Sequence, residues 1–399
     1  MARKMKDSGI EWIGEIPEGW EVAKLKNIVS IVRGGSPRPI EAYMSDNDND
    51  VNWIRISDTE KGSKYITHTS RKLIASGISK SRFIKRGSLI LTNSMSFGEP
   101  YILDIDGCIH DGWVAFSDFK KIDKEFLYYF LTSPLAKIQF EQQVDGGVVK
   151  NLNIDKIGDT VILLPSLIDQ NKIIAHLDSL TSETNSLLSK TITSIEEYKK
   201  LKQAVITQAV TKGVRGEREM KDSGVEWIGE IPKEWVCEKI KYATSISRGL
   251  FNHRPRNDER YYNGKYPFIQ TGDVANATKY IVSYSQTLNE LGKSVSKEFP
   301  KGTLTMTIAA NVGDVAILNF DAYFPDSVVG FVPNKNIRTL YLFYVFSAMK
   351  DEFIRTAIKS TQLNLNIDRV KETFIPVTLN VNEQCEIENF LESKCAEID

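Results

Sequence analysis

The chain has 399 residues, of which 41% are hydrophobic and 26% charged, a composition typical of a soluble globular protein with two or three domains. It lacks the run of about 18 apolar residues that a membrane span needs, and no apolar stretch follows its basic start, so neither a membrane protein nor a secreted one is predicted. The net charge of −1 requires that any contact with nucleic acid come from locally concentrated positive charge. The four cysteines have no paired spacing, so we expect reduced thiols and a cytoplasmic location.

The chain repeats itself with a long period. The segment MKDSGIEWIGEIPEGW at Met5–Trp20 returns as MKDSGVEWIGEIPKEW at Met220–Trp235, an offset of 215 residues. The same offset relates Arg33-Gly34 to Arg248-Gly249, whereas the segments between such anchors diverge strongly. Solenoid repeats have periods of about 20–50 residues, so this period predicts two homologous domains in tandem. A shared frame with divergent contents indicates one task carried out on two different targets.

Short runs rich in β-branched and aromatic residues, bounded by Gly, Asp, Asn or Pro, predict strands in the first copy. These runs are Asn27–Arg33, Val51–Ile56, Ser88–Thr92, Tyr101–Ile105 and Trp113–Phe116. Apolar residues on one face predict a helix over Lys124–Leu131, with Leu340–Phe346 as its counterpart in the second copy. Each copy is therefore expected to be an α+β domain of about 150 residues. The repeated tryptophans are expected to anchor the core, namely Trp12, Trp20, Trp227 and Trp235.

A single long helix is predicted from Gln170 to Ala209, because this stretch contains neither Pro nor Gly. Its apolar residues recur every three or four positions: Ile173, Leu177, Leu180, Leu187, Leu188, Ile192, Ile195, Tyr198, Leu201 and Val205. Such a helix is about 60 Å long and cannot bury its stripe inside a small domain, so it requires a partner helix from this chain or another. Lys212-Gly213 is expected to end it.

Gln384 opens a similar helical pattern after Pro376, but Asp399 corresponds to about Asn185, so this distal helix is some 27 residues shorter than its twin. The sequence leaves open whether the protein uses a short helix or the chain has been truncated. The expected division is a first recognition domain at 1–165, the long helix at 166–213, a second recognition domain at 214–376 and the distal helix at 377–399.

Motifs for catalysis are missing from the sequence. Gly292-Lys293-Ser294 resembles the end of a phosphate-binding loop, but Thr287 stands where that loop needs glycine. The histidines have no metal-binding spacing, and neither a Gly-x-Ser-x-Gly elbow nor a glycine-rich nucleotide loop occurs.

Local charge favours contact with nucleic acid. Eight basic and no acidic residues lie between Lys61 and Arg86, and the second copy gathers basic residues just after Arg248. Lys and Arg neutralise phosphates, while Arg, Asn and Ser also contact base edges, although a solvated surface and a structural Arg-Gly hairpin are the alternatives. The predicted DNA contacts are Arg33, Ser36, Arg38, Lys61, Lys64, Tyr65, Arg71, Lys72, Arg82 and Asn93 in the first copy, and Arg248, Asn252, His253, Arg254, Arg256, Arg260, Lys279 and Asn311 in the second.

Taken in order, these features resemble the specificity subunit of type I restriction-modification systems. The supporting residues are EWIGEIP near each start, the Arg-Gly-Gly-Ser-Pro before Asn52-Trp53-Ile54, Gly87–Leu91, and the Pro165–Gln170 and Pro376–Gln384 segments that lead into helices. The resemblance implies that each copy is a target recognition domain for one half of a bipartite, asymmetric DNA sequence. It further implies that the helices separate the half-sites and dock modification subunits, with Ile173, Leu177, Leu180, Leu188, Ile195 and Tyr198 as the predicted docking residues.

The resemblance also implies that this chain does no chemistry and needs no cofactor of its own. Partner subunits would supply S-adenosylmethionine for adenine methylation, and restriction subunits would use ATP and Mg²⁺. In the family the two helices pair antiparallel, so the short distal helix predicts pairing along only part of the long one and a weaker second partner site. Two other hypotheses are a self-contained nuclease or methyltransferase, which requires a motif we do not find, and an exported bivalent scaffold that does not bind nucleic acid.

Overall fold

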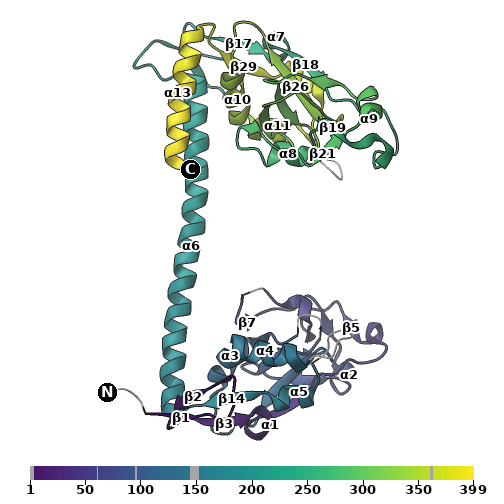
Figure 1. Ribbon diagram of the computed structural model, residues 1–399, viewed down its shortest axis with the longest axis vertical. Coiled ribbons are helices and arrows are strands. Elements are labelled where there is room, and N and C mark those ends of the chain that lie inside the picture. Colours follow the sequence, from purple (N-terminus) through teal and green to yellow (C-terminus); the bar gives the residue numbers. More distant parts are fainter. Residues whose placement is uncertain (1–3, 61, 95–96, 144–151, 360–362) are drawn as a thin grey trace. The chain divides into compact units, whose positions relative to one another are not determined.

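The computed structural model describes residues 4–399 except 61, 95–96, 144–151 and 360–362 (Figure 1). The chain divides into two units, Met1–Leu188 and Ser189–Asp399, and each holds one copy of the repeat. The division falls inside the long helix α6 (Leu167–Lys212), which contributes its first half to one unit and its second half to the other. None of the described helices is both long enough and apolar enough to cross a membrane.

The first unit is built on two five-stranded sheets. The main sheet has the order β4 (Ser30–Arg33), β13 (Trp113–Ser117), β10 (Leu89–Thr92), β11 (Pro100–Leu103) and β7 (Tyr65–Ile66). The second sheet has the order β5 (Met44–Ser45), β8 (Lys72–Leu73), β6 (Val51–Ile54), β12 (Gly107–Ile109) and β9 (Arg82–Ile84). Both sheets contribute to one core, in which Trp113 is fully buried and donates its indole N–H to the carbonyl of Ile54 at 3.2 Å.

The second unit repeats this topology. Its main sheet has the order β18 (Thr244–Arg248), β26 (Val328–Pro333), β23 (Leu304–Thr307), β24 (Val315–Leu318) and β20 (Tyr280–Ile281). Its smaller sheet has the order β21 (Gln286–Leu288), β19 (Tyr262–Phe268), β25 (Ala322–Tyr323) and β22 (Glu298–Phe299). The strands of these sheets correspond one to one, apart from β5, and a separate short pair in the second unit, β27 (Ile358–Lys359) with β28 (Leu363–Asn364), stands outside them. The predicted pair of homologous α+β units is therefore confirmed.

Two helices pack on the main sheet of each unit. In the first unit these are α3 (Lys124–Thr132) and α4 (Pro134–Gln143), and in the second α10 (Thr339–Ala348) and α11 (Lys350–Thr356). The sequence predicted the first of each pair, α3 and α10. The shorter helices are α1 (Leu25–Ile28), α2 (Ala75–Ile78), α5 (Ile154–Asp159), α7 (Ile240–Ala243), α8 (Thr271–Ala275), α9 (Glu290–Ser294) and α12 (Ile367–Glu372). Four of the five predicted strands are shorter than expected, and for two of them a turn replaces the missing residues. A helical turn buries Leu25 and Ile28 ahead of β4, and a 3₁₀ turn at Ile56–Asp58 follows β6.

The start and end of each copy pair as a two-stranded ribbon. β3 (Glu21–Lys24) pairs with β14 (Val161–Leu164), and β17 (Val236–Lys239) pairs with β29 (Phe374–Val377), both antiparallel. Because each ribbon brings the end of the copy back to its beginning, the long helices leave both units from equivalent positions.

The repeated N-terminal segment forms a hairpin in both copies, β1 (Met5–Asp7) with β2 (Glu15–Pro17) and β15 (Met220–Asp222) with β16 (Glu230–Pro232). Trp235 is fully buried, as predicted. The prediction that Trp12 is a core anchor is wrong, because 51% of this residue is exposed. Trp20 is partly buried, and so is Trp227, the counterpart of Trp12, which packs against the core of the second unit. The second hairpin packs against the last turns of α6 through Ile228 and Ile231, in a core that also includes Ile206.

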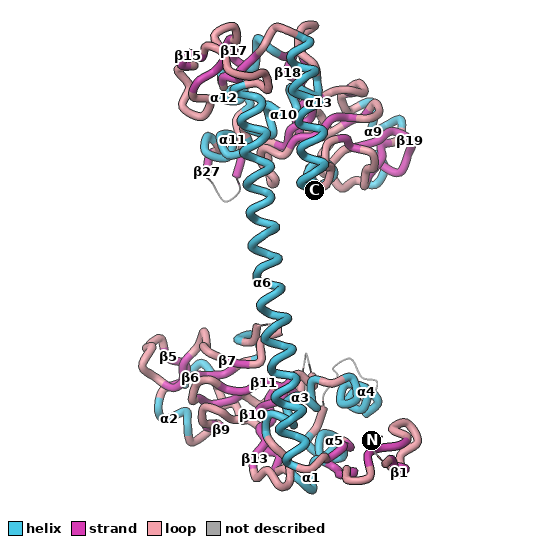
Figure 2. The backbone as a smooth tube through the Cα atoms, turned by 90° about the vertical axis from the view of Figure 1, so that its left-hand side faces the viewer, coloured by secondary structure: helices cyan, strands magenta, loops and turns pink. Residues whose placement is uncertain are grey.

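Helix α6 has 46 residues, which confirms the predicted long helix, and Gly213 follows it with a φ of +73°. Its last turns pack against α13 (Val381–Ile398), which runs antiparallel beside them (Figure 2). Lys202 Nζ lies 2.7 Å from the carboxylate of Asp399, at the far end of this contact. The helix pairing is therefore confirmed for the part of α6 that belongs to the second unit.

A buried glutamine holds the start of each long helix. Gln170, in the first turn of α6, is fully buried. Its side-chain oxygen accepts the N–H of Asp123 at 2.7 Å, and its amide nitrogen donates to the carbonyls of Lys121 and Pro165, each at 2.9 Å. Because Asp123 is the N-cap of α3, this one side chain ties α6 to the helix that covers the main sheet.

Gln384, in α13, makes the same set of bonds. Its oxygen accepts the N–H of Arg338 at 2.8 Å, and its nitrogen donates to the carbonyls of Asn336 and Thr378, each at 2.8 Å. Arg338 is the N-cap of α10, the counterpart of α3. We call these two arrangements, centred on Gln170 and Gln384, the glutamine locks.

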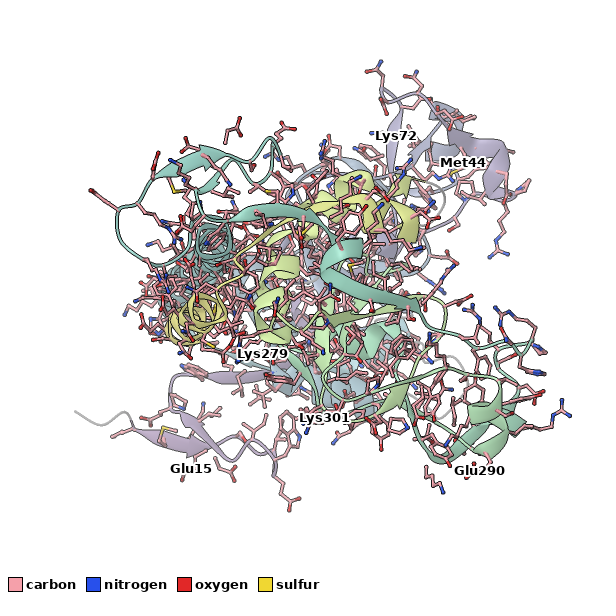
Figure 3. The ribbon with its side chains drawn as sticks, turned by 90° about the horizontal axis from the view of Figure 1, so that it is seen from above. Glu15, Met44, Lys72, Lys279, Glu290 and Lys301 are labelled. Carbon is pink, nitrogen blue, oxygen red and sulfur yellow. The ribbon has the colours of Figure 1, made fainter. Side chains whose placement is uncertain are left out.

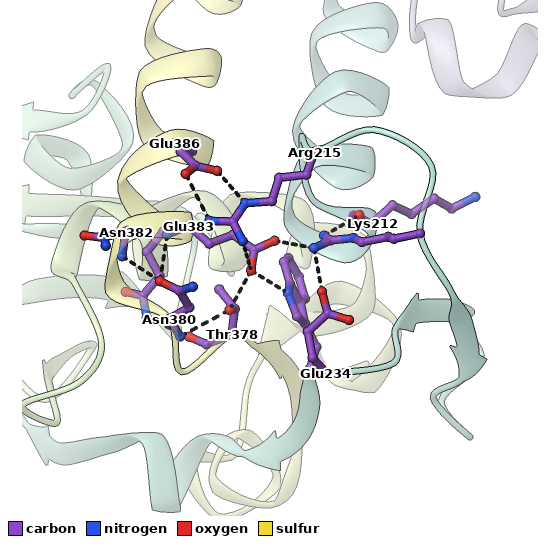
Figure 4. Close-up of polar contacts among 11 residues, drawn as sticks. Lys212, Arg215, Glu234, Thr378, Asn380, Asn382, Glu383 and Glu386 are labelled. Atoms are coloured by element: carbon purple, nitrogen blue, oxygen red, sulfur yellow. Dashed lines mark hydrogen bonds and ion pairs between the residues drawn. The ribbon is translucent and has the colours of Figure 1, made fainter.

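The second unit has a further buried polar group beside its lock (Figure 4). The Glu383 carboxylate is 1% exposed and accepts from Arg218 Nη1 at 2.6 Å, Trp235 Nε1 at 3.1 Å and Thr378 Oγ1 at 3.0 Å. One turn further along α13, Glu386 pairs with Arg215 at 2.7 Å, but both of these side chains are more than 40% exposed. Glu383 thus joins the linker after α6, the hairpin and α13.

We predict that Gln170→Ala opens the first unit and leaves the second unchanged, because buried N–H and carbonyl groups lose their partner. The loss in the free energy of opening should be about 3 kcal/mol. Hydrogen exchange followed by mass spectrometry, resolved by peptide, would show faster exchange in α3 and the first turns of α6. Gln208→Ala, at an exposed position of the same helix, is the matched control. Equal exchange in both variants would contradict the prediction.

We also predict that Glu383→Ala lowers the stability of the second unit by about 3 kcal/mol, since Arg218 keeps only the exposed Glu234 as a charged partner and Trp235 Nε1 loses its buried acceptor. Glu386→Ala removes an exposed ion pair of the same helix and should cost no more than about 1 kcal/mol. Thermal unfolding of both variants measures the difference. Similar melting temperatures would show that the buried network adds no stability.

Candidate nucleic-acid interface

The repeated Arg-Gly turn lies at the end of the first strand of each main sheet. Arg33 Nε donates to the carbonyl of Asp111 at 2.9 Å, and Arg248 Nε donates to the carbonyl of Asp326 at 2.5 Å. A Cβ on Gly34 would lie 2.1 Å from the carbonyl oxygen of His110, so the backbone approach requires glycine. Gly249 is confined in the same way by a carbonyl oxygen of the facing loop. The glycines are therefore structural, while both arginine side chains are exposed.

The aspartate held by this turn has different partners in the two copies. In the first copy Ser36 Oγ donates to Asp111 Oδ1 at 2.6 Å, and this bond lowers the pKa of Asp111. In the second copy Arg254 lies 3.6 Å from the Asp326 carboxylate, and Arg256 forms an ion pair with it. A common backbone thus presents a neutral hydroxyl in one copy and two arginines in the other.

A second shared aspartate orders the loop after β6 in the first copy and after β19 in the second. Asp58 accepts the N–H of Arg55 at 2.9 Å and the hydroxyl of Ser70 at 2.6 Å. Burial opposes its charge, but hydrogen bonds from Ser70 and Arg55 lower the pKa of Asp58. Asp273 accepts the N–H of Gln270 at 2.8 Å in the same way. These aspartates belong to the frame and not to the divergent surface.

Two lysines predicted to contact DNA are instead paired with the long helices. Lys64 Nζ lies 2.6 Å from Glu125 of α3 and 3.3 Å from Asp178 of α6, and Tyr129 donates a hydrogen bond to Asp178. Burial opposes the charge of Lys64, but the hydrogen bond from Lys64 to Glu125 raises its pKa above the ordinary value. Its position beside two carboxylates assigns it a structural role.

The second copy repeats this arrangement, in which Lys279 and Tyr344 both contact Glu392 of α13. We call the two sets, Lys64–Tyr129–Asp178 and Lys279–Tyr344–Glu392, the lysine clamps. Each clamp joins the edge strand of a main sheet to the long helix that follows it. The structure therefore gives Lys279, like Lys64, a role in positioning its helix.

Two of the remaining basic residues of the first copy form hydrogen bonds within that copy. Lys72 Nζ donates to Asn52 Oδ1 at 2.7 Å, and Arg82 Nε donates to the carbonyl of Arg33 at 2.7 Å. The other predicted contacts that are exposed are Arg38, Tyr65 and Arg71. Figure 3 shows Met44 and Lys72 on the neighbouring strands β5 and β8. Lys61 lies outside the described residues.

The prediction that Asn93 contacts DNA is corrected by its burial, since only 5% of this residue is exposed. It follows β10 in the core, where its backbone N–H donates to the carbonyl of Gly112 and its carbonyl accepts from Leu152. Asn93 was predicted as a contact because an asparagine side chain can bind base edges. Residue type alone does not determine whether a side chain is buried.

In the second copy the predicted residues cluster on the loop after β18. His253 stacks on Tyr261 with ring centroids 3.9 Å apart and lies 3.0 Å from Asp258, and Arg260 pairs with the same carboxylate at 2.7 Å. The Arg260 hydrogen bond holds the pKa of Asp258 well below its usual range. The exposed fraction of the Arg260 side chain is 76%, so solvent screens its ion pair. Asn252 and Asn311 are also exposed.

Sequence reasoning missed a cavity in the first copy. Its volume is 940 Å³, and its lining includes Trp53, Arg55 and His110 beside the predicted residues Ser36, Arg38 and Arg71. A comparison of Ser36 with Phe251, the residue at the same offset, could have suggested a difference in volume between the copies. Among the described residues, we find no group of three His, Cys, Asp or Glu side chains arranged to hold a metal ion. All four cysteines are free thiols.

The predicted docking residues on α6 fall into two groups. Ile173 packs partly against the core of the first unit, and Leu177 is half-buried. The others are exposed, with exposed fractions of 46% for Leu180, 57% for Leu188, 49% for Ile195 and 56% for Tyr198. These four residues form what we call the exposed stripe.

Comparison with known proteins agrees with this architecture. A family model of the type I restriction modification DNA specificity domain matches residues 17–197 and 246–398. The type I restriction enzyme MjaVIII specificity subunit of Methanocaldococcus jannaschii is 25% identical over 244 residues, covering 59% of this chain and 52% of the relative. A putative MjaX specificity subunit from the same organism is 25% identical over 359 residues, covering 85% and 78%. The EcoBI specificity subunit of Escherichia coli is 24% identical over 245 residues, covering 59% and 50%, so two of these matches span about half of the relative.

Two solved structures share the fold. One, from a study of complex assembly and conformational transition of the type I R-M system, has a TM-score of 0.72 at 17% identity and covers 96% of this chain and 92% of that one. The crystal structure of the HsdS subunit from Thermoanaerobacter tengcongensis has a TM-score of 0.54 at 16% identity, covering 96% and 90%. Because the family model accounts for most of the sequence in two separate matches, the chain belongs to the type I restriction modification DNA specificity family and carries its domain twice.

Proposed function

We propose that the protein is the DNA recognition subunit of a type I restriction-modification complex, with each unit recognising one half of a bipartite, asymmetric DNA sequence. The observation that carries this proposal is the Arg-Gly turn. It has the same backbone in both units but presents Ser36 on Asp111 in one and Arg254 and Arg256 on Asp326 in the other. Different side chains on one frame are what two unlike half-sites require.

The exposed stripe of α6 supports a second element of the proposal, the docking of modification subunits. Large apolar side chains along successive turns of a helix are stable in water only when a partner covers them. The partner subunits would bring S-adenosylmethionine for adenine methylation, and restriction subunits would bring ATP and Mg²⁺, while this chain is not itself catalytic. The length of α6, about 70 Å for 46 residues at 1.5 Å each, would set the spacing between half-sites.

Methylome sequencing tests the proposed function. DNA from cells that express this chain with a modification subunit should carry adenine methylation at one split motif, and omission of this chain should abolish it. Exchange of residues 22–160 for those of another family member should change only one half of the motif. If the modification subunit methylates DNA with another specificity chain but not with this one, the proposal is wrong.

We predict that Ile195→Asp weakens binding of a modification subunit at least tenfold. Burial of the isoleucine side chain in the interface is worth about 1.5–3 kcal/mol, and the aspartate both loses this contribution and adds the cost of burying a charge. Ser194→Asp adds the same charge to the adjacent exposed position and should change the affinity little. Analytical ultracentrifugation or calorimetry with the purified partner measures both. Equal affinities would place the docking surface elsewhere on the chain.

A further inference from the structure

The two copies differ most where the first has a cavity. Ser36 lines it, on the loop that follows the Arg-Gly turn. The corresponding position in the second copy is Phe251, which is 3% exposed. Both loops are held by equivalent backbone bonds, from Gly35 N–H to the Ile109 carbonyl and from Leu250 N–H to the Phe324 carbonyl, each at 3.0 Å. The positions can therefore be compared directly.

In the second copy aromatic rings occupy this region. The ring of Phe251 lies 5.3 Å from that of Phe268 and 5.7 Å from that of Tyr262, measured between centroids. These rings form a separate small core together with Leu288 and Tyr323. The first copy has Trp53 at the position of Phe268 but nothing larger than a serine at the position of Phe251. The small side chain of Ser36 leaves space in the first copy.

One wall of the first-copy cavity is apolar, with Ile40, Met44, Ile56 and the edge of the buried Trp53. His110 packs beside Trp53, with ring centroids 6.1 Å apart. Burial lowers the pKa of His110, so near neutral pH it contributes a flat uncharged ring and not a cation.

The rest of the lining carries the positive charge of Arg38, Arg55 and Arg71 and the single negative charge of Glu41, so its net charge is positive. Arg55 is held in place by bonds from its Nη2 to Ser70 at 2.6 Å and to Asp58 at 3.4 Å. Its Nε is buried and has no hydrogen-bond partner among the described residues. A buried guanidinium N–H without an acceptor is costly, and the fixed side chain keeps the Arg55 charge at the cavity.

We propose that this cavity binds a nucleotide, with the ring against the apolar wall and the phosphate or a base oxygen at the arginines. This inference rests on the proposed function. It implies that the first unit, and not the second, takes up a nucleotide of its half-site. The volume lies within the range of pockets that enclose small ligands, about 300–1,000 Å³. Arginine is suited to phosphate and to base acceptor atoms, and flat apolar surfaces hold an unstacked base without a sequence-specific bond.

The same chemistry could come from a free mononucleotide or from a nucleotide displaced from the DNA duplex. Withdrawal of a base from the stack costs a few kcal/mol, so the DNA source predicts local distortion of the first half-site only. The second unit, whose equivalent space is filled by Phe251, should leave its half-site stacked.

The test uses the full chain and the DNA motif found by methylome sequencing, without the modification subunit, because a methyltransferase itself flips its target base. 2-Aminopurine, whose fluorescence rises when it is unstacked, is placed at each position of both half-sites in turn. Ser36→Phe fills the cavity with the residue that the second copy uses. Ser117→Phe makes the same exchange at an exposed position on β13 and serves as the control. Met44→Trp fills the cavity from the opposite wall, in case Ser36→Phe disturbs the turn. A parallel calorimetric titration uses free nucleoside 5′-monophosphates.

We expect a several-fold rise in fluorescence at one position of the first half-site, lost in Ser36→Phe and Met44→Trp and retained in Ser117→Phe. Binding of free nucleotides that both filling variants abolish, without a fluorescence response, would support the cavity and identify the free nucleotide as its ligand. Neither response in the wild-type chain, or responses that both filling variants retain, would overturn the proposal. Methylation at a split motif would persist in that case, so failure of the cavity is distinguishable from failure of the proposed function.

Discussion

The two glutamine locks determine how the long helices leave the globular units. A glutamine side chain has one acceptor and two donor hydrogens, and both Gln170 and Gln384 use all of these on backbone groups. The direction of a helix is set by its first turn, so a small rotation there would displace the far end of α6 by many ångströms. A fully satisfied buried amide permits no such rotation without loss of several hydrogen bonds at once.

The lysine clamps strengthen this constraint further along each helix. Asp178 lies eight residues after Gln170, and Glu392 lies eight residues after Gln384, so each helix is held at two points on one face. The frame of each copy is therefore a set of polar contacts between the main sheet, the helix that covers it and the long helix. The loops around Ser36 and Phe251 take no part in these contacts, and this separation lets them differ without moving the helices.

The sequence was sufficient for the elements that depend on periodicity and repetition. The duplication, the main strands, α3, α10 and α6 are local patterns, and the structure confirms them with small changes in their bounds. It was insufficient for residues whose role depends on distant partners. The basic residues Lys64 and Lys279 fit a DNA surface by composition, but their charges are matched by Asp178 and Glu392, more than a hundred residues away. Asn93 is buried by tertiary packing, and the Arg55 Nε lacks a hydrogen-bond partner because of the tertiary structure around it. Neither property can be predicted from the local sequence.

The exposed stripe has a consequence for the lifetime of the chain in a cell. Leu188, Ile195 and Tyr198 present apolar surface of the kind that chaperones and proteases recognise on incompletely folded proteins. In the proposed complex, modification subunits cover this surface and protect the chain by mass action, and we expect the uncovered chain to be more prone to degradation or aggregation. The abundance of the free protein is then expected to follow the supply of the subunits that cover α6.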